Sequence, residues 1–186
     1  GTGSGKTEIF LWSLMGHLAM EGDRNPSGVT QRGIRSLIMY PMNALVSDQV
    51  ARLREMMGIR PVDASKRPGR DILRDAFHRV PQFMQYTSRS PYHGDYNNSK
   101  NAAQLADRVQ RWINYESSAP GTPTHDLFLK LVDKRRLPEK NFQQFQANNF
   151  WTSEDDPELF ARHEGRWGPG HTNPCGGIPD VLVTNY

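Results

Sequence analysis

The sequence of 186 residues predicts an α/β fold, in which a parallel sheet carries flanking helices and a long, mainly helical insertion. Three observations lead to this expectation. A glycine-rich stretch at residues 1–7 runs directly into an apolar, helix-like segment. Short apolar runs at Ser36–Tyr40 and residues 180–184 have the character of parallel strands in a buried sheet. Residues 95–178 are polar and contain no strand-like run, which explains the low mean hydropathy of -0.72.

The glycine-rich stretch Gly-Thr-Gly-Ser-Gly-Lys-Thr fits the phosphate-binding pattern G-x-x-x-x-G-K-[ST], whose first position would fall one residue before Gly1. Glycines let backbone N–H groups turn toward a phosphate, and the helix that follows directs its positive end at the anion. Lys6 would reach the β- and γ-phosphates, and the Thr7 hydroxyl would complete a Mg²⁺ shell. The alternative is a flexible glycine turn with a surface lysine.

We therefore predict a nucleotide site with Lys6 and Thr7 as its catalytic residues and Thr7 as the metal contact through the nucleotide. Its feeding strand is expected before residue 1. The cofactor-binding residues are Gly1, Thr2, Gly3, Ser4, Gly5, Lys6, Thr7 and Glu8.

Composition limits the other classes of function. A formal charge of +3 permits a nucleic-acid partner without requiring one. The single cysteine, Cys175, excludes an internal disulfide framework and suits a reducing compartment. No apolar run approaches the roughly 20 residues of a membrane span. We expect a soluble, cytoplasmic protein without a membrane partner.

The first part of the chain predicts alternating helices and strands. Apolar residues cover nearly the whole circumference of a helix over residues 6–20, which predicts a buried helix. A Gly-, Asn- and Pro-rich connection then leads to the strand Ser36–Tyr40, expected to be covered on both faces. A single apolar stripe predicts a helix over Asn43–Met57, ended by Gly58.

The remaining elements are a short helix over residues 71–79 and a strand over residues 83–87. Within the polar stretch, helices are expected at residues 102–115, 125–136 and 158–164, before a strand returns at residues 180–184. This order divides the chain into residues 1–94 as the N-terminal part of an ATP-binding domain, residues 95–178 as an insertion, and residues 179–186 as the returning strand.

The ordered motifs resemble superfamily 2 DEAD/DEAH-box helicases and translocases, in particular the large bacterial type related to repair and phage-defence helicases. Residues 1–8 resemble their motif I and residues 40–49 their motif Ia. Residues 86–91 are similar to the segment after the next strand. Residues 180–186 resemble motif Ib, with Asn185-Tyr186 where DEAD-box proteins usually have Pro-Gly.

The resemblance implies a P-loop NTPase of RecA-like fold that uses ATP and Mg²⁺ and acts on DNA, with RNA left open. It also implies a second RecA-like domain elsewhere in the same protein, and a protein complex as a partner. The acidic motif II is expected after Tyr186, so the fragment alone is expected to be inactive. Two alternatives stay open: a P-loop NTPase that acts on a partner other than nucleic acid, and a helicase fragment that only binds.

The expected contacts with the nucleic-acid backbone come from the loops that follow the strands. Asn43 is placed to cap a helix whose free N–H groups suit a phosphate, and Arg52 adds charge on its polar side. Thr184 ends a strand at the edge where open α/β sheets bind ligands. The alternatives are a simple cap, a solvated arginine and an ordinary strand end. The full set is Pro41, Asn43, Gln49, Arg52, Arg89, Thr184 and Asn185.

Other polar and aromatic residues do not form a convincing site. His163, His171 and Cys175 lack the paired spacing of a zinc site, and a fourth ligand is not apparent. The scattered aromatics could stack on single-stranded bases, but we expect them to attach the insertion to its domain. These aromatics are Trp112, Tyr115, Trp151 and Trp167. Arg89 and His93 could be further contacts with the nucleic-acid backbone, and the alternative that we favour for them is a solvated loop.

Overall fold

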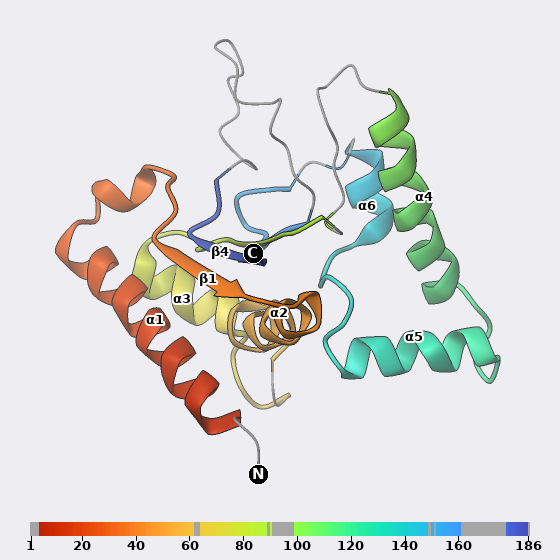
Figure 1. Cartoon of the computed structure of the whole chain (residues 1–186), viewed down its shortest axis with the longest axis horizontal. Helices are drawn as coiled ribbons and strands as arrows, with labels where there is room; N and C mark the ends of the chain where they lie inside the picture. The colour runs from red at the N-terminus through yellow and green to blue at the C-terminus, as the bar shows by residue number, and fades with distance from the viewer. Residues whose placement is uncertain are drawn as a thin grey trace.

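The computed structural model describes residues 4–61, 64–88, 90, 99–148, 150, 152–160 and 178–185. Its elements follow one another as helices, strands and one short 3-10 turn (Figure 1). The helices are α1 (Ser4–Arg24), α2 (Asn43–Met57), α3 (Gly69–Phe77), α4 (Ser99–Glu116), α5 (Pro123–Asp133) and α6 (Phe142–Ala147), and the 3-10 turn is Gly28–Thr30. The strands are β1 (Ser36–Tyr40), β2 (Phe83–Tyr86), β3 (Glu158–Leu159) and β4 (Val181–Asn185).

The described strands form one four-stranded parallel sheet in the order β1-β4-β2-β3. The last of the described strands, β4, therefore lies between β1 and β2. Ser36 pairs with Val181, and Phe83 pairs with the same residue from the other side. The predicted α/β class with a parallel sheet is confirmed, and the carboxyl ends of the strands meet at one edge.

The starts of three strands are held together by the buried carboxylate of Asp180. Asp180 is fully buried and accepts hydrogen bonds from the guanidinium groups of Arg35 and Arg79, at 2.8 and 2.7 Å. It also accepts one from the backbone N–H of Gln82 at 2.8 Å, while Arg35 pairs with Glu21 on α1. Because a buried carboxylate needs such partners, this network fixes the relative level at which β1, β2 and β4 begin.

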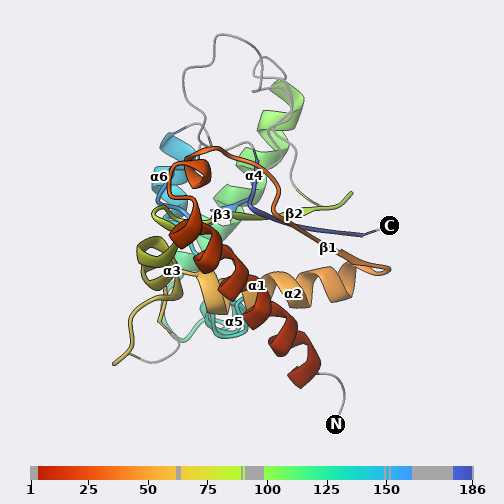
Figure 2. The ribbon, with the colours of Figure 1, turned by 90° about the vertical axis from the view of Figure 1, so that its left-hand side faces the viewer.

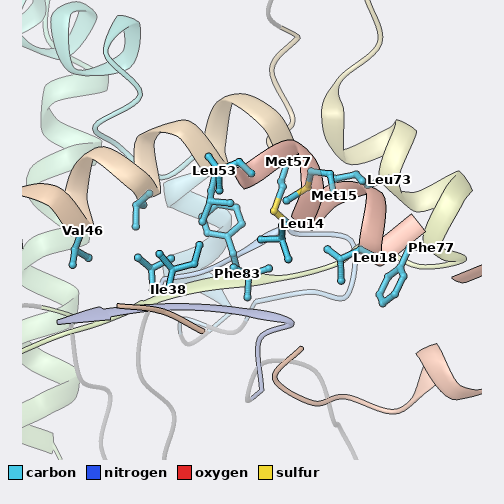
Figure 3. Packing of buried hydrophobic residues seen from close by; sticks show 14 of the residues in the cluster. Leu14, Met15, Leu18, Ile38, Val46, Leu53, Met57, Leu73, Phe77 and Phe83 are labelled. Carbon is cyan, nitrogen blue, oxygen red and sulfur yellow. The ribbon is translucent and has the colours of Figure 1, made fainter. Parts of the chain in front are cut away.

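Helices α1, α2 and α3 lie on one side of the strands (Figure 2) and enclose the main hydrophobic core. Side chains of α2 point toward Ile38 and Phe83 of the sheet, and Leu18 of α1 lies close to Phe77 of α3 (Figure 3). The core residues are Leu11, Leu14, Met15, Leu18, Val29, Ile38, Val46, Val50, Leu53, Met57, Leu73, Phe77, Phe83, Val181 and Val183.

Helices α4, α5 and α6 form a separate group beside the sheet with a core of their own (Figure 1). Trp112 packs there against Phe142 and Phe160, with ring centroids 5.1 and 4.8 Å apart. Trp112 thus packs within the insertion and not against the α/β core, which differs from the expected attachment of the insertion to its domain, whereas Trp151 and Trp167 lie outside the described residues. The buried members are Leu105, Val109, Ile113, Leu137, Phe142, Phe145 and Phe150. The proposed boundaries at residues 94 and 178 stay a prediction.

Buried ion pairs and hydrogen bonds join the α/β core to the group of helices α4, α5 and α6. The side chains of Arg54 on α2 and Glu158 on β3 are both buried and form a bidentate pair at 2.8 and 2.7 Å. Arg54 also donates to the backbone carbonyl of Arg135, 2.7 Å away. Glu139 accepts from the backbone N–H of Arg60 at 3.0 Å and pairs with Arg135. The α/β core and the insertion therefore meet through charged groups that lie out of the solvent.

Two expectations about the insertion are wrong. Residues 158–164 were expected to form a helix, but Glu158–Leu159 is strand β3, paired in parallel with β2, and residues 161–164 lie outside the described part. The polar residues 95–178 therefore do contain a strand, because pairing with the free edge of β2 overrides the weak helical preference of residues 158–164. Helix α6 was not expected, and it is capped by Asn141, which accepts from Gln144 N at 2.9 Å.

Two expectations about burial are also wrong. Helix α1 buries only one side, because Ile9 and Trp12 are 69% and 67% exposed. Strand β1 is covered on one face within the described residues, since Leu37 and Met39 are 52% and 55% exposed. Both results follow from the arrangement of the described helices α1, α2 and α3, which all lie on the same side of the sheet.

Candidate nucleotide and nucleic-acid site

The carboxyl edge of the sheet gathers the ends of three strands. Tyr40 pairs with Asn185, and Thr184 pairs with Tyr86 on the neighbouring strand. The loops that begin at Pro41, Thr87 and Asn185 therefore start side by side. This proximity follows from the parallel register and is the arrangement in which open α/β sheets bind ligands.

The phosphate-loop residues lead into the start of α1. Lys6 and Thr7 lie in the first two turns of α1, which begins at Ser4, and the side chains of residues 4–7 lie outside the described part, as do Gly1, Thr2 and Gly3. The start of α1 and the carboxyl ends of β1 and β4 lie toward the same side of the molecule (Figure 2). A glycine-rich sequence followed by a helix start with a lysine fits the binding of a nucleoside triphosphate with Mg²⁺.

The start of α2 differs from the expected cap. Met42 is the N-cap residue and provides no side-chain hydrogen bond, while Asn43 is the first helical residue. The expectation that Asn43 caps the helix is therefore wrong, because the chain enters the helix one residue earlier. Among the described residues, the buried Oδ1 of Asn43 has no hydrogen-bond partner. The uncapped helix start keeps the anion-binding character that motif Ia would need.

The two other candidates on α2 have different surroundings. Gln49 is 5% exposed and belongs to the inward stripe with Val46 and Val50, so its side chain is not presented to solvent. Its Oε1 has no partner in the part of the chain that the structure describes. Arg52 is only partly exposed, and its Nη1 donates to Oε1 of Glu8 at 2.9 Å. Neither side chain stands free at the surface.

The loop after β2 and the end of β4 are connected by hydrogen bonds. The Thr184 hydroxyl donates to the backbone carbonyl of Tyr86 at 2.6 Å. Because a hydroxyl has one proton, this bond leaves Thr184 only acceptor capacity on its side chain. Ser90 shapes the next turn, accepting from Thr87 N at 3.0 Å and donating to Gln85 O at 2.7 Å. Arg89 and His93 lie outside the described residues, while Pro41 is exposed and Asn185 half-buried.

A groove between α1, α2 and α3 was not expected from the sequence. Its volume is about 750 Å³, and it is lined by Glu8 and Arg52 together with apolar side chains that include Leu11, Trp12 and Leu73. The basic residues of the loop before α3, Lys66 and Arg67, also line it, and their clustering was the available signal. A hydrogen bond to Asp75 raises the pKa of the Arg67 guanidinium, which stays charged.

Two classes of site are not found in the described ranges. None of their helices combines the length and apolar character that crossing a membrane requires. Groups of three or more His, Cys, Asp or Glu side chains that could hold a metal ion do not occur in the same ranges. The residues His163, His171 and Cys175 lie outside them.

Comparison with known proteins finds a family model that is similar to the first part of the chain. Residues 1–90 match the model of the DEAD/DEAH box helicase family. The chain is also 34% identical, over 210 aligned residues, to Druantia protein DruE of Escherichia coli (strain UMEA 4076-1). That alignment covers the whole chain but spans only 10% of the relative. No solved structure matches the chain. The motifs, the parallel sheet and the family model therefore agree that residues 1–90 are similar to DEAD/DEAH box helicases.

Proposed function

We propose that this chain is the ATP-binding part of the motor of an ATP-dependent DNA helicase or translocase. The observation that carries the proposal is the register of β1, β4 and β2, which supports a shared ligand edge for the loops at Pro41, Thr87 and Asn185. The family of residues 1–90 supports a helicase-type motor. A P-loop NTPase acting on another kind of partner is the alternative.

In this proposal the two helix starts have separate ligands. ATP with Mg²⁺ supplies a triphosphate whose hydrolysis drives conformational change. Lys6 would neutralise its terminal phosphates, Thr7 would hold the metal, and the backbone N–H groups of residues 1–5 would bind the β-phosphate. The start of α2 and the backbone at Thr184 and Asn185 hold the nucleic-acid backbone, without reading its bases.

The proposal extends to the rest of the protein, because this chain spans only a tenth of the relative it matches. A second RecA-like domain elsewhere in the polypeptide would complete the ATP site. A cytoplasmic location, a protein complex and a role in phage defence belong to the same proposal. They are supported by the resemblance to large bacterial helicases.

The first test is the substitution Lys6→Ala in the full-length protein. We expect nucleic-acid-stimulated ATP hydrolysis to fall by about a hundredfold or more, as when one preorganised positive group at a charged transition state is removed. Steady-state phosphate release is the measurement. Lys130→Ala, at an exposed lysine on α5, is the matched control and should keep wild-type turnover. Unchanged turnover in Lys6→Ala would refute the phosphate-loop assignment.

The second test separates nucleic acid from other partners. ATP hydrolysis by the full-length protein is measured without nucleic acid, with single-stranded DNA and with single-stranded RNA, at low and moderate salt. Contacts to phosphates make the stimulation fall steeply with salt, because binding releases counterions. We expect stimulation by DNA with that salt dependence. Hydrolysis that responds to neither polymer would favour the alternative NTPase.

A further inference from the structure

One ion pair connects the two helices to which the proposed function assigns different ligands. Glu8 follows directly after Lys6 and Thr7 on α1, and Arg52 lies on α2, the helix whose start is proposed to hold nucleic acid. The Arg52 guanidinium donates to the Glu8 carboxylate across 2.9 Å. The sequence had assigned Glu8 to the nucleotide and Arg52 to nucleic acid, so the structure joins residues expected to act separately.

The position of α2 is restricted on its other sides. Val46, Val50 and Leu53 pack on the sheet, and the buried pair of Arg54 with Glu158 holds the same helix to β3. Because these contacts keep α2 from turning freely, a movement of the start of α1 on nucleotide binding would be passed to α2 as a whole. Arg52 and Glu8 are the charged contact on the side that faces α1.

The exposure of this pair suits a link that forms and breaks. The Glu8 side chain is 53% exposed and that of Arg52 is 29% exposed. Exposed ion pairs have small net energies, because water competes for both groups, so the pair can open without a large cost. The neighbouring acid Glu55 lies one turn along α2 and lines the same groove, which gives Arg52 a second acidic neighbour when Glu8 moves.

We propose that the pair Glu8–Arg52 couples nucleotide binding at α1 to nucleic-acid binding at α2. Arg52 is then a positioning residue, which orients α2 through Glu8 and does not itself bind the phosphate backbone. The proposal rests on the proposed function, because it needs both ligands. Coupling between two sites is reciprocal, so each ligand should change the affinity for the other by the same factor.

The test measures that factor in the full-length protein. The dissociation constant of a fluorescent single-stranded DNA is determined without nucleotide and with a non-hydrolysable ATP analogue plus Mg²⁺. We expect the ratio of the two constants to shrink by roughly two- to fivefold in Glu8→Gln and in Arg52→Gln, the range of an exposed pair. In the double variant the ratio of the two constants should shrink no further than in either single variant, because both substitutions remove the same interaction.

The matched control is the exposed pair Arg111–Asp107 on α4, 3.0 Å apart, whose variants Arg111→Gln and Asp107→Asn should keep the wild-type ratio. Two results would overturn the coupling role. The first is weaker DNA binding without nucleotide in Arg52→Gln but not in Glu8→Gln, and the second is a reduction of the ratio in the double variant that equals the two single reductions combined. The first would make Arg52 a direct ligand. Absence of DNA binding by the unmodified protein would instead refute the proposed function.

Discussion

Two arginines two positions apart on α2 show how differently one helix can use the same side chain. Arg52 pairs with Glu8 in partial contact with water, whereas Arg54 pairs with Glu158 out of the solvent. The buried pair has lost its hydration and depends on its partners, while the exposed pair can exchange them for water. One holds the insertion against the core, and the other is suited to respond to a ligand.

Removing one member of the buried pair should give the largest effect. In Arg54→Met, Glu158 is left buried without its counter-charge, and we expect a loss of about 3–5 kcal/mol in local stability. The double variant Arg54→Met with Glu158→Met should recover most of this loss, because paired ions can be replaced by apolar groups of similar size. Hydrogen exchange of α2 and β3 amides in the full-length protein measures the loss in the single variant and its recovery in the double variant. Equal protection in Arg54→Met and wild type would contradict the role of the Arg54–Glu158 pair in holding the insertion against the core.

The separation of the two cores predicts where apolar truncations act. Leu53→Ala in the main core and Leu105→Ala in the insertion each remove a buried side chain, with an expected cost of about 2–5 kcal/mol. The first should increase hydrogen exchange in β1 and β4, and the second only in α4, α5 and α6. If Leu105→Ala also loosened the sheet, the two cores would behave as one cooperative unit, and the comparison between core and insertion would fail.

The sequence was sufficient where a local pattern determines the structure. The apolar stripe of α2 predicted the bounds Asn43–Met57 as observed, and the run Ser36–Tyr40 predicted β1. Parallel strands of this kind also led to the shared carboxyl edge, which the register of Thr184 bears out. The roles of Lys6 and Thr7 stay predictions, which depend on the phosphate-binding pattern alone.

The sequence was insufficient where the partner is distant in the chain. Strand β3 exists because β2 offers an edge more than 70 positions earlier, and this pairing overrides the weak helical signal of residues 158–164. The pair Glu8–Arg52 joins residues 44 positions apart, and Arg54–Glu158 joins residues 104 positions apart. Gln49 was expected among the contacts with nucleic acid, yet it is buried on the apolar stripe of α2. Such contacts depend on tertiary packing, which local periodicity does not encode.

The smallest effect is expected at the cap of α5. This helix, described over its whole length, buries none of its residues, so its stability depends more on its ends than that of α6, which buries Phe142 and Phe145. Thr122 caps α5 by accepting a hydrogen bond from His125 N at 3.3 Å. Thr122→Ala should therefore cost about 1 kcal/mol of local stability, seen as faster hydrogen exchange in the first turn of α5. The exposed Thr124 serves as the control, because Thr124→Ala changes a neighbouring threonine that is not the N-cap residue. Equal exchange in both variants would mean that packing of Phe128, Leu131 and Val132 on α4, and not the cap, keeps α5 folded.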